Sequence, residues 1–195
     1  MSDVFDQPDD AATPLTEEEK RDLKLSYIAS RSELNAAEQE NIARGQNWAL
    51  RRRRDILSES FIRELHRHML GDVWRWAGNF RTSERNLGID FWEIPVAVRM
   101  LLEDAKTWIE KDTYPPDEIA VRFHHRLVHI HPFPNGNGRL ARLMADLLIK
   151  QLGGAPFSWG RGSLRDHGDL RKGYIAALQA ADNHDIRPLL DFARS

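Results

Sequence analysis

The sequence predicts an all-α fold with one small β-hairpin near its middle. Three observations support this prediction. Several segments place apolar residues three and four positions apart, which is the spacing of one helix face. Ser, Thr or Asn begins some of these segments and glycine ends others, as is typical of helix caps. Only residues 74–92, which are rich in aromatic and turn residues, alternate weakly in the manner of a hairpin.

The N-terminal quarter is expected to be a tail followed by two helices. Residues 1–15 contain four aspartates and two prolines without an apolar period, and we expect a disordered tail there. Order begins at Thr16, which has capping-box spacing to Glu19. A second helix opens at Asn35 and continues to about residue 50 despite Gly45. Residues 16–54 therefore form a predicted N-terminal helical region.

Residues 55–195 are expected to form the main domain. A helix over 58–70 carries Phe61, Leu65 and Met69 on one face and stops at Gly71. After the hairpin, the spacing of apolar residues is again that of helices in five segments. These segments cover residues 94–112, 115–130, 139–152, about 168–182 and 186–194.

Composition limits the classes of function. The 195 residues are 41% hydrophobic, which is enough for a core. Lys and Arg number 28 and Asp and Glu number 30, so the net charge of −2 predicts neither direct nucleic-acid binding nor membrane binding. The absence of cysteine excludes disulfides and thiolate metal sites. Without a positively charged start or a long apolar run, a cytoplasmic protein is expected.

One stretch, HIHPFPNGNGRLAR at residues 129–142, combines residues that suit an anion. Its glycines permit positive φ angles that let N–H groups converge, and the next helix adds unpaired N–H groups and a positive dipole end. Arg139 and Arg142 lie on one side of the first helical turn, where guanidinium groups bind phosphate oxygens. The stretch therefore predicts a polyphosphate site, with His131 beside it to accept or give a proton.

This stretch resembles the motif of the Fic family. The P-loop pattern is absent, and GNGRLA, which satisfies the dinucleotide fingerprint, follows a helical rather than a strand pattern. The family pattern H-P-F-x-[D/E]-G-N-G-R-x-x-R agrees with HPFPNGNGRLAR at eleven of twelve positions, counting the three positions that accept any residue. With the upstream WAGNFR segment, the resemblance covers about residues 55–180 and is closest to the group called mobile mystery protein B.

The Fic resemblance implies a protein adenylyltransferase, which transfers AMP from ATP to a Ser, Thr or Tyr hydroxyl of a target protein. His131 would be the general base, and Mg²⁺ would bind at the position of Asn135. The implied phosphate-binding residues are Asn135, Gly136, Asn137, Gly138, Arg139 and Arg142.

The resemblance also implies a target-docking flap and an inhibitory helix. The flap would align the target by adding a strand. Fic proteins are often inhibited by a helix with the pattern [S/T]-x-x-x-E-[G/N], which Glu40 and Asn41 match in part, although Ala36 replaces the Ser or Thr. Glu40 is therefore the predicted inhibitory partner of Arg142. The predicted flap residues are Asn79, Phe80, Arg81, Thr82, Asn86, Leu87, Gly88 and Ile89.

Asn135 departs from the family pattern, which usually has Asp or Glu at this position to bind magnesium. A neutral amide oxygen attracts a cation less than a carboxylate does, so weaker magnesium binding is expected. Three outcomes follow: slower AMP transfer, phosphotransfer at the same site, or nucleotide binding with little catalysis in a toxin-antitoxin or mobile-element pair. By resemblance, the partner in such a pair would be a helix-turn-helix or antitoxin protein.

Overall fold

The computed structural model describes residues 17–52, 54–161 and 168–195. The tail predicted over residues 1–15 and the cap predicted at Thr16 lie outside these ranges. In the described ranges the chain is helical and forms no strand. The α-helices are α1 (Glu17–Arg21), α2 (Arg31–Leu50), α3 (Glu59–Leu70), α4 (Ile94–Glu110), α5 (Pro116–Ile130), α6 (Asn137–Gln151), α7 (Asp169–Asp182) and α8 (Arg187–Arg194), and two 3₁₀ turns are η1 (Phe91–Glu93) and η2 (Trp159–Arg161).

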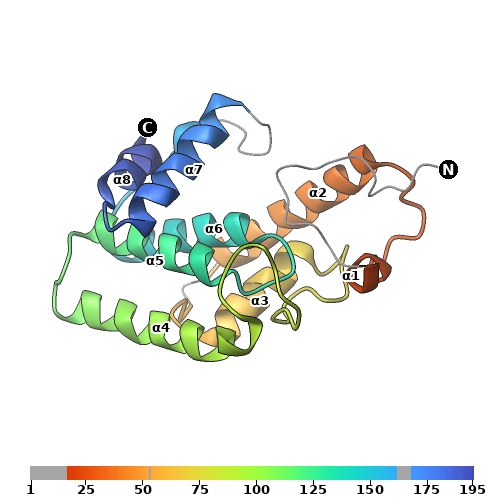
Figure 1. Ribbon diagram of the computed structural model, residues 1–195, viewed down its shortest axis with the longest axis horizontal. Helices are drawn as coiled ribbons and strands as arrows, with labels where there is room; N and C mark the ends of the chain where they lie inside the picture. Colours follow the sequence, from red (N-terminus) through yellow and green to blue (C-terminus); the bar gives the residue numbers. More distant parts are fainter. Residues whose placement is uncertain (1–16, 53, 162–167) are drawn as a thin grey trace.

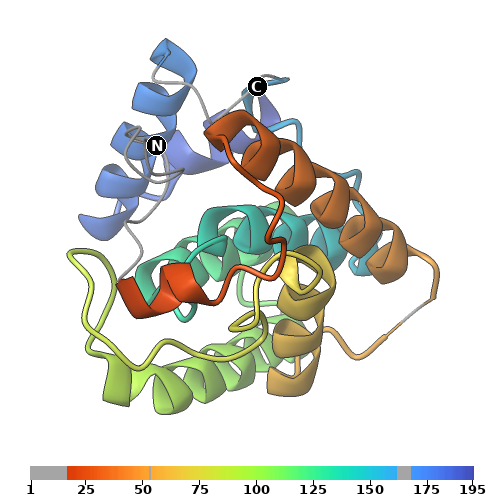
Figure 2. The same ribbon diagram turned by 90° about the vertical axis from the view of Figure 1, so that its right-hand side faces the viewer.

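Helices α5 and α6 lie at the centre of the molecule (Figures 1 and 2). α6 packs beside α5, and the other helices surround this pair: α4 lies along α5, α3 contacts α6, and α8 contacts α5. α2 packs mainly on α3, and α7 on α8. The central pair is apolar because its sequence period places large side chains inward, and Phe123, Leu127 and Leu140 are fully buried.

The N-terminal helices differ from the prediction at their ends. α2 begins at Arg31 rather than Asn35, because Ser30 forms a capping box with Glu33: each side chain accepts a hydrogen bond from the backbone of the other residue. α1 spans only five residues, and Leu23, which follows it, pairs with Trp74 in an isolated antiparallel bridge.

The predicted β-hairpin over residues 74–92 is wrong. This segment consists of turns and the start of η1, and it forms no ladder of strand hydrogen bonds. Arg75 N–H donates to Asp22 O, and Arg81 N–H donates to Pro132 O at 2.9 Å. Trp74 and Trp76 face the core and stack on each other with ring centroids 5.1 Å apart. Burial of these rings, and not strand pairing, fixes the segment.

No helix in the described part of the chain combines the length and the apolar character that a membrane span requires.

Candidate active site

The loop between α5 and α6 has two backbone positions in the left-handed region. His131 ends α5 at φ 53° and ψ 59°, and its N–H donates to Leu127 O at 3.2 Å. Gly136 precedes α6 at φ 82°, and a Cβ atom there would lie 2.6 Å from Leu70 Cδ1. Glycine is needed at this position both for its conformation and for the close packing of the loop on α3.

Asn137 braces the loop with its side chain. Its Oδ1 accepts a hydrogen bond from Phe133 N–H at 2.9 Å, and its Nδ2 donates to Phe133 O at 2.8 Å. The Asn137 amide is thus committed to the loop, and its side chain is not directed at a ligand. The first intrahelical bond of α6 runs from Leu140 N–H to Gly136 O, so the N–H groups of residues 137–139 precede the hydrogen-bonded turn and suit an anion.

The side chain of Asn135 turns back into this loop. Its Oδ1 accepts a hydrogen bond from Gly136 N–H at 2.6 Å and lies 3.4 Å from Arg139 Nη2. An amide oxygen that accepts from an N–H group beside a guanidinium cation does not fit a magnesium ligand. In the described ranges, no group of three or more His, Asp or Glu side chains is arranged to bind a metal.

The two motif arginines have different neighbours. Arg139 Nη1 donates to Glu38 Oε2 of α2 at 2.8 Å, and Trp74 Nε1 donates to the other oxygen of Glu38, also at 2.8 Å. The guanidinium carbon of Arg142 lies 5.6 Å from the ring centroid of Tyr174 in α7. α2 and α7 therefore meet the start of α6 from separate sides, one at each arginine.

His131 is 8% exposed, and its pKa is lowered to about 4. Burial is the largest cause, the positive charges of Arg81 and Arg85 add to it, and a hydrogen bond to the Val128 backbone opposes it. The imidazole is therefore neutral at physiological pH. The His131 ring nitrogen that bonds to the Val128 carbonyl carries the proton of the neutral ring, so the other ring nitrogen is the one that accepts a proton.

The predicted flap residues fall into two groups. Arg81 is 2% exposed; its Nε donates to His131 O at 2.7 Å, and its Nη2 donates to Ile89 O. Phe80 packs on Phe133 with centroids 5.4 Å apart. These two residues anchor the segment and do not lie on its outer surface. The other group is exposed at the surface and comprises Asn79, Thr82, Asn86, Leu87 and Gly88, with Ile89 half-buried.

Gly88 brings the flap against His131. It has φ 91°, and a Cβ atom there would lie 2.5 Å from His131 Cβ. Any larger residue would push the segment away from the imidazole. Leu87, which is 57% exposed, therefore lies next to the point where the flap touches His131.

Glu40 does not pair with Arg142 in the structure. Its carboxylate forms an ion pair with Arg44 at 2.7 Å, and its side chain is 74% exposed. The acid of α2 that reaches the motif is Glu38, at Arg139. Helical spacing explains the difference: Glu38 and Glu40 lie two residues apart and so point to different sides of α2.

Sequence reasoning also missed His66 and Tyr174. His66 of α3 is fully buried and stacks on Phe133, with centroids 3.8 Å apart and planes 7° apart. Tyr174 contacts the buried His124 through its hydroxyl at 3.0 Å from Nε2. Both residues occupy apolar helix faces, so their sequence pattern alone is that of core residues.

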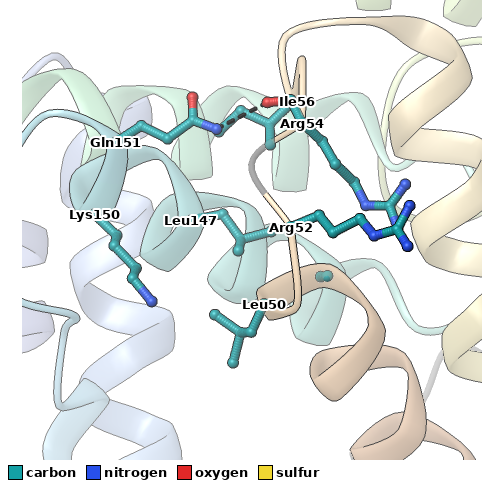
Figure 3. A pocket seen from close by; sticks show the side chains of 8 residues that line it. Leu50, Arg52, Arg54, Ile56, Leu147, Lys150 and Gln151 are labelled. Atoms are coloured by element: carbon teal, nitrogen blue, oxygen red, sulfur yellow. Dashed lines mark hydrogen bonds between the residues drawn. The ribbon is translucent and has the colours of Figure 1, made fainter.

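A separate cavity of about 280 Å³ lies at the far end of α6 from the motif. Figure 3 shows Arg52 and Arg54 extending to one side of it and Lys150 to the other. Arg52 and Arg54 thus line this cavity, and the guanidinium carbon of Arg54 lies 4.0 Å from the ring centroid of Trp48. Because it adjoins residues 147–151, this cavity is distinct from the loop at residues 131–139.

Comparison with known proteins gives consistent matches. The model of the Fic/DOC family matches residues 56–149. "Protein adenylyltransferase Fic" of Aedes aegypti is 32% identical over 150 residues, which are 75% of this chain and 29% of that protein. The chain therefore spans less than a third of the length of this relative.

Solved structures share the fold. BepC of Bartonella tribocorum, crystallised with bound AMPPNP, superposes with a TM-score of 0.69 at 17% identity and covers 92% of this chain and 97% of that chain. Fic-1 of Caenorhabditis elegans has a TM-score of 0.63 at 26% identity, covering 87% of this chain and 49% of that chain.

Proposed function

Residues 56–149 form a domain of the Fic/DOC family, and from this membership we propose that the chain transfers AMP from ATP to a hydroxyl group of a target protein. The observation that carries the proposal is a neutral, loop-terminal His131 beside the open N-terminus of α6 and its two arginines. Relatives named protein adenylyltransferase support the same reaction.

In this proposal His131 accepts the proton of the target hydroxyl. The hydroxyl oxygen forms a bond to the α-phosphorus of ATP, the bond between that phosphorus and the bridging oxygen breaks, and pyrophosphate leaves. The proton goes to the ring nitrogen of His131 that is not bonded to the Val128 carbonyl. Such a base contributes roughly 10²- to 10⁴-fold to the rate.

The phosphates of ATP would bind at the start of α6. The backbone N–H groups of Gly136, Asn137 and Gly138 supply donors, and the helix dipole favours the negative charge. Arg139 and Arg142 would neutralise the β- and γ-phosphates. Asn135 Oδ1 now accepts from Gly136 N–H and lies near Arg139, so it would rotate away when a phosphate oxygen replaces it.

The exposed part of the flap would align the target. Thr82, Asn86, Leu87 and Gly88 are exposed, and Gly88 adjoins His131. The backbone of a target segment would bond to this portion by strand addition, so that main-chain geometry places the hydroxyl near the imidazole. Residues 16–54 would act as an N-terminal region that contacts the motif through α2.

Intact mass after incubation with ATP and magnesium tests the proposal. The expected result is an adduct of one adenylyl group on the chain itself or on a protein of a cell lysate. His131→Ala should lower the rate by roughly 10²- to 10⁴-fold. His129→Ala is the matched control, because this histidine lies two residues before His131 and its side chain is 60% exposed. This variant should leave the rate unchanged.

Other results would replace the proposal. A phosphate adduct would indicate a phosphotransferase. ATP binding in calorimetry without any adduct would indicate a nucleotide-binding component of a two-protein pair.

A further inference from the structure

His66 lies where three segments of the fold meet. It belongs to α3, its ring is fully buried, and one face stacks on Phe133 of the motif loop. On one side, Nδ1 lies 2.9 Å from the backbone nitrogen of Gly78, at the base of the flap. On the other side, Nε2 lies 3.0 Å from the carbonyl oxygen of Asn135. One side chain thus contacts both the flap and the loop that would bind phosphate.

These two contacts determine the tautomer of His66. A backbone N–H group only donates, so Nδ1 must be the unprotonated acceptor of Gly78 N–H. The single proton of the neutral ring is therefore on Nε2, which donates to Asn135 O. Burial lowers the pKa of His66 to about 3, even though the bond to Asn135 opposes this shift. The ring consequently stays neutral and keeps both bonds in the physiological range.

The bond to Asn135 orients the next N–H group. The described chain has no cis peptide bond, and in a trans peptide the C=O and the N–H point in opposite directions. Because the Asn135 carbonyl points to His66, the Gly136 N–H points away from α3. It meets the Asn135 Oδ1, on the side where Arg139 Nη2 also lies. This is the side on which a phosphate oxygen would bind.

We propose that His66 is a positioning residue for the phosphate site, which fixes the Asn135–Gly136 peptide through Nε2 and the flap base through Nδ1. The inference rests on the proposed function for its catalytic consequence. The role differs from core packing, since a phenyl ring in the same place would stack on Phe133 but would leave Gly78 N–H and Asn135 C=O without these partners.

Three variants separate positioning from packing. His66→Phe keeps the ring and removes both hydrogen bonds. His66→Gln keeps one acceptor and one donor at similar separation and serves as the rescue variant. His68→Phe is the matched control, because it replaces a histidine of the same helix that stacks on Trp48, away from the motif loop. Melting temperature is measured for all three to confirm that they fold.

Two measurements without nucleotide test the geometry. Nitrogen-15 spectra of labelled histidine should show the His66 ring, assigned by the loss of its signals in both His66 variants, protonated only at Nε2 and neutral from pH 8 to pH 5. The amide resonances of Gly78 and Gly136 should shift in His66→Phe and return toward the wild-type positions in His66→Gln. Protonation of the His66 ring at Nδ1 overturns the inference, as do unchanged Gly136 and Gly78 resonances in folded His66→Phe.

Two further measurements test the effect of His66 on nucleotide binding and on AMP transfer. The Kd for a non-hydrolysable ATP analogue should rise about tenfold or more in His66→Phe, and the rate of AMP transfer should fall about 10²-fold, as small misplacements of reacting groups produce. His66→Gln should recover most of both, and His68→Phe should match the wild type. Wild-type Kd in folded His66→Phe overturns the inference. If the wild type binds ATP but transfers no AMP, the proposed reaction fails while the resonances and Kd still decide the role of His66.

Discussion

His131 combines a left-handed backbone with a buried ring, and its surroundings set its affinity for the proton. Arg81 and Arg85 both lower its pKa, but only Arg81 also bonds to its carbonyl. Arg85 bonds to Ser83 Oγ and Glu84 O within the flap and acts on the pKa of His131 through its charge.

Arg85→Gln should therefore raise the pKa of His131 from about 4 toward the ordinary value of 6.5. Because only the neutral imidazole accepts a proton, the acid limb of the rate profile should move to higher pH by the same amount. An NMR titration of His131 measures the shift directly. Arg99→Gln, on the exposed surface of α4, is the control and should leave the titration where it is. A downward or absent shift in Arg85→Gln contradicts the electrostatic assignment.

Asn135 stands at the position where the resemblance implies a magnesium ligand. Its oxygen is occupied by Gly136 N–H and lies near Arg139, and it has no negative charge. Asn135→Asp should raise the rate of AMP transfer and lower the magnesium concentration needed for half of the maximal rate, because a carboxylate is a preferred ligand of this ion. Asn135→Ala separates loss of the amide from gain of charge. An Asp variant with the wild-type magnesium dependence would show that this position does not bind the metal.

Helix α2 connects the N-terminal region to the motif through Glu38. Glu38 is 6% exposed and accepts hydrogen bonds from both Trp74 and Arg139. Glu40 lies two residues later on the exposed side. These two glutamates of one helix form a natural pair of test and control.

Glu38→Ala should lower the free energy of unfolding by about 2–4 kcal/mol, because it leaves the Trp74 N–H and a largely buried guanidinium without this carboxylate. Glu40→Ala removes only a surface ion pair and should change it by less than about 0.5 kcal/mol. Urea denaturation measures both. Equal losses of stability in the two variants would contradict this distinction. Separately, a change of self-modification in Glu40→Gly would support the predicted inhibitory pairing of Glu40 with Arg142, which the structure does not show.

At the scale of elements, local sequence predicted the helices and failed on the middle segment. Periodic apolar residues placed α3 to α8 near their observed bounds, since a helix is defined by contacts within four residues. Ser30 and Glu33 would have revealed the true start of α2, because they have the spacing of the capping box that begins this helix. The segment 74–92 lacks strands because its backbone partners, Asp22 and Pro132, are distant in sequence.

Across the whole molecule, buried neutral histidines make stability depend on pH. His66 and His124 are fully buried with pKa values lowered to about 3, and His131 follows at about 4, with burial as the main cause in each case. The unfolded chain binds a proton at each of these rings near pH 6.5, whereas the folded protein does so only near pH 3 to 4. The contribution of these three rings to the free energy of unfolding is therefore fully present above pH 6.5 and is lost progressively as the pH falls below it.

Between pH 7 and pH 5 the free energy of unfolding should fall by about 2 kcal/mol for each of these histidines. Urea denaturation at the two pH values measures the change. His66→Gln, compared with the wild type at both pH values, should show a smaller loss by about one such contribution. The same free energy at pH 5 and pH 7 in the wild type would contradict the burial of these rings in their neutral state.

The sequence by itself determined the helices and the chemistry of the loop, since both are encoded within short segments: apolar periods in the helices, and one histidine, two glycines and two arginines between residues 131 and 142. Only the tertiary structure decided which acid meets Arg139, which ring orients Asn135 and how weakly His131 binds a proton. Glu38 and Arg139 are 101 positions apart, and His66 and Asn135 are 69 apart. Such contacts, and the burial that shifts pKa values, arise only when the helices pack, because no local pattern specifies which distant residue will fill a given place.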